Sequence, residues 1–261
     1  MSEEDVLVRS IAVIDDYTDR STCTEGFLRL KRFILQNTYT DGTTSPHYRC
    51  DVLSRRSVDA VAVVLWSRDP ETGDILVHYR EGTRPPVWLR RLKQDELPYP
   101  DPAPFDVIGE IVAGVLEDED DGPAGVARRG AIEAKEEAGY DVDPAVVEHL
   151  GQGGLFPTPG VTDEKIYLVA VEVDPATRGQ AHGDGSVLEE GTRMVTRELR
   201  EAIALCRQGV IPDAKSELGL LRLADHLGYI PQLGLFVHEL PEDLQGRLHA
   251  LGTAGEPRRR S

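Results

Sequence analysis

The sequence predicts a mixed α/β fold, in which helices cover both faces of a central sheet. Two nearly continuous runs of apolar and β-branched residues, 59–66 and 165–173, are typical of buried strands. Residues 123–138 and 214–227 instead predict helices. Strands mixed with helices in this order are typical of layered architectures, so we expect an α/β/α sandwich with a mixed sheet.

Shorter elements fill the rest of the chain. Residues 6–54 hold short β-like runs, among them residues 28–35, which predicts a small N-terminal antiparallel β unit. Residues 75–79 follow a polar turn and predict an antiparallel partner for the strand at 59–66. Residues 85–104 hold six prolines and are expected to form a loop. The remaining elements are an apolar segment at 105–116, a strand at 193–196 and a helix at 199–208.

The composition argues against nucleic acid and membranes as partners. The 29 Lys and Arg against 46 Asp and Glu give a formal charge of −17, which repels phosphate backbones and anionic lipids. Cys23, Cys50 and Cys206 lack metal-type spacing and are odd in number, so neither a zinc site nor a disulfide framework is indicated. No apolar run approaches a membrane span, and the acidic residues 1–5 do not resemble a secretion signal. We therefore expect a cytoplasmic protein.

One helix carries a candidate metal site. In the helix predicted at 123–138, Glu133, Glu136 and Glu137 stand at i, i+3 and i+4, so their carboxylates share one face. They lie near the negative end of the helix dipole, and a hard divalent cation with oxygen ligands would relieve the repulsion. A solvated acidic face is the alternative. The opposite face carries small residues that let the helix approach a sheet closely: Ala127, Ala131, Ala134 and Ala138.

This helix lies in a segment, residues 113–140, that resembles the Nudix box. The second half of the box pattern has Arg-Glu, an apolar residue, any residue, Glu-Glu, any residue, Gly and an apolar residue. The positions that match it are Glu133, Ala134, Glu136, Glu137, Gly139 and Tyr140. The resemblance implies a Nudix-type sandwich in which the helix glutamates bind metal.

The first half of the box departs from the family pattern. Gly114 and Glu133 are nineteen residues apart, further than in the family, which implies an insertion around residues 117–121. Ile132 replaces the box arginine, and Ala124 stands where its glutamate partner belongs. Because the arginine and the glutamate of this pair are both absent, neither position carries an unpaired charge. Arg129, one turn before Glu133, is a candidate replacement for the brace between loop and helix.

The chain from residue 28 to residue 227 is similar to the branch of this family that acts on ADP-ribose and other nucleoside diphosphate sugars. The turn Arg84-Pro85-Pro86 implies that Arg84 meets the substrate. The run from Glu110 to Gly114 matches the Glu-x-x-Ala-Gly that leads into the box. The match implies that Glu110 faces the substrate and that the carbonyl of Ala113 is a metal ligand.

Two loops extend the resemblance. Residues 158–164 are similar to a Ser-Pro-Gly-x-Thr-acidic loop of this branch, which implies substrate contacts for Pro159 and Gly160. Without the family, the same residues are a tight turn. Residues 188–191 stand where the branch has a mobile acidic loop, which implies that Glu190 binds metal and that Glu189 is the general base. A solvated loop is the alternative for both glutamates.

Together these resemblances imply an Mg²⁺-dependent enzyme, with Mn²⁺ as the alternative ion. It would cleave the diphosphate of a nucleoside diphosphate sugar of the ADP-ribose, UDP-glucose or GDP-mannose type into a nucleoside monophosphate and a sugar phosphate. The implied metal ligands are Ala113, Glu133, Glu136, Glu137 and Glu190, and the catalytic residues are Glu137, Glu189 and Glu190. Two alternatives stay open: a non-catalytic Nudix-like nucleotide-sugar sensor, and a hydrolase of NADH, a dinucleotide polyphosphate or an inositol pyrophosphate.

The resemblance also divides the chain into three parts. Residues 1–54 would be an N-terminal β unit, which in this branch commonly crosses to a partner and so implies a homodimer. Residues 55–230 would be the Nudix catalytic domain. Residues 231–261 would be a C-terminal extension that ends in a disordered basic tail, Arg258-Arg259-Arg260.

Overall fold

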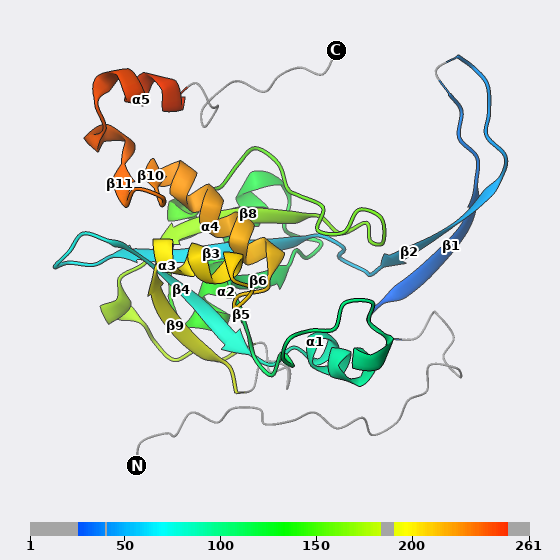
Figure 1. Ribbon diagram of the computed structural model, residues 1–261, viewed down its shortest axis with the longest axis horizontal. Coiled ribbons are helices and arrows are strands. Elements are labelled where there is room, and N and C mark those ends of the chain that lie inside the picture. The colour runs from blue at the N-terminus through cyan, green and yellow to red at the C-terminus, as the bar shows by residue number, and fades with distance from the viewer. Residues whose placement is uncertain (1–25, 40, 184–190, 250–261) are drawn as a thin grey trace.

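A seven-stranded mixed sheet forms the centre of the molecule (Figure 1). The computed structural model describes residues 26–39, 41–183 and 191–249. The strands of the sheet are β3 (Ala60–Arg68), β4 (Ile75–Gly82), β5 (Ile108–Glu110), β6 (Val112–Val115), β7 (Glu148–His149), β8 (Ile166–Glu172) and β9 (Arg193–Glu198). Their order is β5-β4-β3-β8-β7, with β6 also beside β3 and β9 also beside β4.

β3 and β8 form the parallel centre of the sheet. Every residue from Val61 to Leu65 is at most 1% exposed, because both faces of β3 are covered. A strand buried on both faces has no polar side to alternate with, which accounts for its continuous apolar run. The buried strands predicted at 59–66 and 165–173 are therefore confirmed.

β3 and β4 pair with each other at one end only. Further along, β5 bonds to β4 and β6 bonds to β3, so residues 108–115 lie between the two strands. Ile111 separates β5 from β6, and its N–H donates to Ser216 Oγ at 2.8 Å. This inserted segment places Glu110 and Ala113 in the interior of the fold.

Helices cover both faces of the sheet (Figure 1). One face carries α2 (Gly122–Ala138), and the other carries α3 (Leu199–Arg207) and α4 (Ala214–Leu227). The alanine stripe of α2 packs on the sheet and is at most 9% exposed. The helix ends at Gly139, whose φ of 80° is readily adopted only by glycine. The predicted α/β/α sandwich is confirmed.

The N-terminal unit is a hairpin of β1 (Arg29–Leu35) and β2 (Tyr48–Ser54), which projects from the sandwich (Figure 1). The N–H of Leu53 donates to the Val161 carbonyl at 2.8 Å, where the hairpin meets the sandwich. The antiparallel unit predicted before residue 55 is confirmed from residue 29 onward; residues 1–25 lie outside the described part of the chain.

One prediction about local structure was wrong. Residues 85–104 were expected to form a loop because of their prolines, but they begin with α1 (Pro85–Leu89) and the 3-10 helix η2 (Arg90–Glu96). Pro85 and Pro86 stand in the first turn of α1, where a helix has no partner for the missing N–H and φ is already suitable.

The C-terminal segment returns to the end of α4, where the Val237 N–H donates to the Gly228 carbonyl at 2.7 Å. A short pair of strands, β10 (Tyr229–Ile230) and β11 (Leu235–Phe236), is followed by α5 (Glu242–His249). Further 3-10 turns are η3 (Pro144–Val146), η4 (Pro175–Thr177) and η6 (Val237–Glu239). The predicted basic tail lies outside the described residues. Among the helices of the described segments, none combines the length and the apolar character needed to cross a membrane.

Candidate active site

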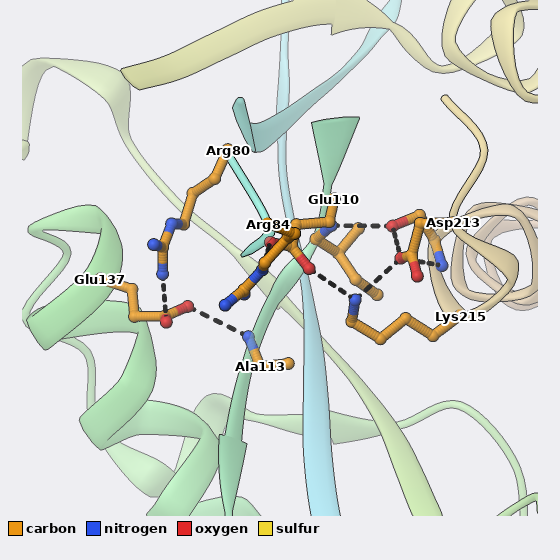
Figure 2. A network of polar contacts seen from close by, with 9 residues as sticks. Arg80, Arg84, Glu110, Ala113, Glu137, Asp213 and Lys215 are labelled. Carbon is orange, nitrogen blue, oxygen red and sulfur yellow. Dashed lines mark hydrogen bonds and ion pairs between the residues drawn. The ribbon is translucent and has the colours of Figure 1, made fainter. Parts of the chain in front are cut away.

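Glu137, in the last turn of α2, has a buried carboxylate with two partners. One oxygen forms an ion pair with Arg80 of β4, and the other accepts the N–H of Ala113 at 3.1 Å (Figure 2). The side chains of Glu137 and Arg80 are 6% and 4% exposed. Charges withdrawn from water in this way need such partners, so the contacts fix the end of α2 against β4 and β6.

Glu133 lies one turn earlier, over Gly114 of β6. A Cβ at position 114 would lie 1.9 Å from the Cδ of Glu133, so the carboxylate occupies the space that a side chain would fill. The Oε1 of Glu133 is 4.0 Å from Arg129 Nη1. Two glutamates of α2 therefore meet adjacent residues of one strand, Glu133 at Gly114 and Glu137 at Ala113.

The donors at this place fit a hard divalent cation. The carboxylates of Glu133 and Glu137 and the carbonyls of β6 offer oxygen ligands, and the missing side chain at Gly114 gives Glu133 its room. Glu136 is half-buried on the same helix. Across the described ranges, no three His, Cys, Asp or Glu side chains lie close enough to hold a metal ion, and Glu137 is turned toward Arg80. The metal site stays a prediction.

Arg129 braces the inserted loop against α2. Its Nε donates to Asp120 Oδ2 at 2.7 Å, and its Nη2 is 3.2 Å from Glu117 Oε2. The loop approaches the helix so closely that a Cβ on Gly125 would lie 2.3 Å from the Asp120 carbonyl carbon. The insertion thus supplies the carboxylate that Ala124 cannot. The prediction that Arg129 replaces the lost box arginine is confirmed.

A second ionic network surrounds Glu110 (Figure 2). Its Oε1 accepts from Arg84 Nε at 2.5 Å, and its Oε2 accepts from Lys215 Nζ at 2.8 Å. Burial alone would raise the pKa of Glu110, but the charges of Lys215 and Arg84 outweigh it and hold this pKa below its usual range. Glu110 is therefore ionised at neutral pH. The structure brings Arg84 and Glu110, the two predicted substrate-binding residues, into contact, and their role stays a prediction.

Arg80 and His78 were not anticipated from the sequence. His78 is buried between Ser67 Oγ and Thr196 Oγ1, each 2.9 Å from a ring nitrogen. Burial, with a smaller contribution from Arg178, lowers the pKa of His78 to about 4. The available signal was a pair of polar residues at i and i+2 in an otherwise apolar strand, which places both on one face. That face is the one toward α2.

Glu137 opens onto a cleft of about 600 Å³ beside β9. The cleft is lined by Glu137, Arg178, Ala181, Thr192, Arg193, Met194, Val195, Thr196 and Arg197. Of its three arginines, Arg193 is paired with Glu81 at 2.8 Å and Arg197 lies 3.5 Å from Glu201. The cleft therefore presents guanidinium groups, the side chains best suited to bind phosphate oxygens, in a chain whose formal charge is −17.

The predicted substrate loop lies at a different cavity. Pro159 and Gly160 line an apolar pocket of about 360 Å³ together with Cys50 and Val52 of β2. None of the residues that line it also lines the cleft of Glu137. Glu189 and Glu190, the predicted base and loop ligand, lie outside the described residues.

Comparison with known proteins identifies the family of the chain. No family model matches the chain. The chain is 30% identical over 199 residues to the GDP-mannose pyrophosphatase of Cronobacter sakazakii (strain ATCC BAA-894), an alignment that covers 76% of this chain and 89% of that protein. The chain therefore belongs to the Nudix hydrolase family, in its nucleotide-sugar pyrophosphatase branch, and is an enzyme.

Proposed function

We propose that the protein hydrolyses the diphosphate bond of a nucleoside diphosphate sugar and releases a nucleoside monophosphate and a sugar phosphate. The observation that carries the proposal is the meeting of Glu133 and Glu137 with adjacent residues of β6, beside a cleft that holds arginines. The similarity to a GDP-mannose pyrophosphatase supports the substrate class and makes GDP-mannose the first candidate.

We propose that a divalent cation, Mg²⁺ or Mn²⁺, is held by Glu133, Glu137 and the Ala113 carbonyl, with Glu136 and Glu190 completing the donor set. When bound, the ion supplies charge neutralisation for the diphosphate and activation of the attacking water. The supporting observation is the room left at Gly114, where any side chain would displace the Glu133 carboxylate.

The residues of the chain would then divide the remaining work. Arg80 neutralises Glu137 in the absence of ligand, and in the complex its guanidinium is placed to bind a phosphate oxygen beside that carboxylate. Arg84 binds the diphosphate from the Glu110 side. Arg178 and Arg197 line the cleft and attract the anionic substrate. Glu189 is proposed to orient and deprotonate the water.

We further propose a homodimer built on the N-terminal hairpin. Phe33 and Ile34 of β1 are 44% and 66% exposed, and Tyr48 of β2 is 41% exposed. Large apolar side chains gathered on one projecting unit are typical of an association surface. In this arrangement residues 1–54 form the dimerising unit, residues 55–230 the catalytic domain and residues 231–261 an extension. The apolar pocket beside Pro159 lies where the hairpin meets the catalytic domain.

The alternative raised by the sequence, a nucleotide-sugar sensor without catalytic activity, runs against the family assignment, and one contact defines what it would require. The pair of Arg80 and Glu137 satisfies the carboxylate charge without any metal ion. A protein that kept this pair in the complex would bind the ligand and leave the diphosphate intact.

Turnover assays distinguish the two candidates. The full-length protein is incubated with GDP-mannose, ADP-ribose, UDP-glucose, NADH and a dinucleotide polyphosphate, with Mg²⁺, with Mn²⁺ or with EDTA, and products are separated by ion-exchange chromatography. We expect metal-dependent release of a nucleoside monophosphate and a sugar phosphate from at least one nucleotide sugar. Binding of a nucleotide sugar in calorimetry without any product would instead establish the sensor. Turnover of NADH or the polyphosphate alone would reassign the substrate class.

A further inference from the structure

Lys215 is a buried cation in an unfavourable place. It lies in the first turn of α4, where the helix dipole opposes positive charge, and its side chain is 16% exposed. Burial of an ammonium group costs stability unless the group is paired. Lys215 has two carboxylate partners: Glu110 Oε2 at 2.8 Å and Asp213 Oδ2 at 2.9 Å. Burial lowers the pKa of Lys215, but the two carboxylates outweigh it and raise this pKa, so the group is charged.

The first turn of α4 holds two adjacent residues of the inserted segment. Asp213 caps the helix by accepting the Ser216 N–H at 3.0 Å and the Ser216 hydroxyl at 2.5 Å. Ser216 Oγ in turn accepts the N–H of Ile111, and Lys215 binds the side chain of Glu110. The helix therefore fixes both the backbone and the carboxylate at this point of the segment.

Glu110 divides its two oxygens between two cations. Lys215 binds Oε2 from one side and Arg84 binds Oε1 from the other, so the carboxylate links the two cations (Figure 2). Glu110 and Lys215 are enclosed, with side chains 8% and 16% exposed, whereas Arg84 is 34% exposed and reaches solvent. Of the three residues, Arg84 is the one that a ligand can reach.

We propose that Lys215 is a positioning residue for substrate binding, which acts through Glu110 to hold the Arg84 guanidinium in the orientation that receives the diphosphate. The proposal rests on the proposed function. Without Lys215, one carboxylate oxygen of Glu110 loses its ammonium partner from α4, and the carboxylate is free to rotate away from Arg84. Arg84 then samples several orientations and must be ordered by the substrate, which weakens binding.

The test compares Lys215→Met, Lys215→Arg and the control Lys93→Met, which removes a positive charge from an exposed position of η2. With the substrate that the wild type turns over best, we expect Lys215→Met to raise KM about tenfold while kcat changes less than about threefold, because ground-state binding is lost. Lys215→Arg should restore KM to within about threefold, and Lys93→Met should match the wild type. A KM for Lys215→Met within twofold of the wild type, at about the wild-type kcat, overturns the proposal.

A double-mutant cycle tests the route through Glu110 and covers a Lys215→Met variant that fails to fold. Glu110→Gln/Lys215→Met removes both charges, so position 110 carries no uncompensated carboxylate, and Asp213 keeps the N–H and hydroxyl of Ser216 as partners. If Lys215 acts through Glu110, the double variant should show nearly the same KM as Glu110→Gln alone. Additive effects overturn the proposal. A wild type that turns over no nucleotide sugar contradicts the proposed function instead, so the two failures are distinguishable.

Discussion

Gly114→Ala is the substitution for which the structure predicts the sharpest separation of activity from stability. The added Cβ would lie 1.9 Å from both Cδ and Oε1 of Glu133 and 2.6 Å from its Cγ. Apolar contacts settle near 3.5 Å, so the carboxylate must move by about 1.6 Å. It is the flexible end of a side chain, and Gly114 does not need a positive φ, so the backbone need not shift.

The expected cost in stability is therefore small and the expected cost in activity is large. Overpacking of rigid cores costs about 1–3 kcal/mol, and a mobile side-chain end should keep the loss below about 1 kcal/mol. A displacement of about 1 Å in a reacting constellation lowers rates by about 100-fold, so kcat should fall by about that factor or more. Thermal unfolding and steady-state turnover at saturating Mg²⁺ measure the two effects.

Gly246→Ala is the matched control for this prediction. Gly246 lies in α5, and a Cβ there would meet nothing within 4 Å. The control should keep full activity and gain up to about 1 kcal/mol of stability. A Gly114→Ala enzyme that retains wild-type turnover would refute the idea that the position of the Glu133 carboxylate matters for the reaction.

Three further perturbations test other parts of the structure. Arg129→Met should cost about 2 kcal/mol in urea unfolding, because the buried Asp120 carboxylate loses one of its two guanidinium partners and keeps Arg128; an unchanged free energy of unfolding would contradict the brace. The pKa of His78 is lowered from 6.5 to about 4, so the neutral ring contributes fully to the free energy of unfolding above pH 6.5. This contribution, up to about 3 kcal/mol, is lost as the pH falls toward 4. His78→Asn should reduce the pH dependence of the free energy of unfolding, measured by chemical denaturation. An unchanged pH dependence would show that other groups cause it. Phe33→Glu/Ile34→Glu should convert the proposed dimer to a monomer in sedimentation velocity. A wild type that is already monomeric would contradict the proposed dimer.

The parts of the fold that the sequence predicted are those in which local signals agree. α2 combines an alanine stripe with a proline in its first turn and a glycine at its end, and each signal acts within a few residues. β3 and β8 are recognised because burial on both faces removes polar residues from the run. Pro85 misled the prediction, because a proline that forbids a helix interior is favoured at a helix start.

The site residues that could be named from the sequence were those given by the resemblance to the family, because their tertiary contacts are not visible in local patterns. Glu133, Glu137 and Ala113 came from the box, and the structure does bring Glu137 and Ala113 together. The pairing of Arg80 with Glu137 depends on the register of β4 against the inserted segment, which no local pattern encodes. Lys215 binds a residue 105 positions earlier in the chain, so its role appears only in the folded protein.

The most direct test of the proposed metal-dependent hydrolysis is the rate of nucleotide-sugar cleavage by Glu137→Gln as a function of Mg²⁺ concentration. Glu172→Gln, at the exposed end of β8, is the matched control. We expect metal-dependent turnover by the wild type and the control, and a loss of at least about 100-fold in Glu137→Gln that added Mg²⁺ does not restore, with the fold retained in circular dichroism. Undiminished Mg²⁺-dependent hydrolysis by Glu137→Gln would contradict the assignment of this site.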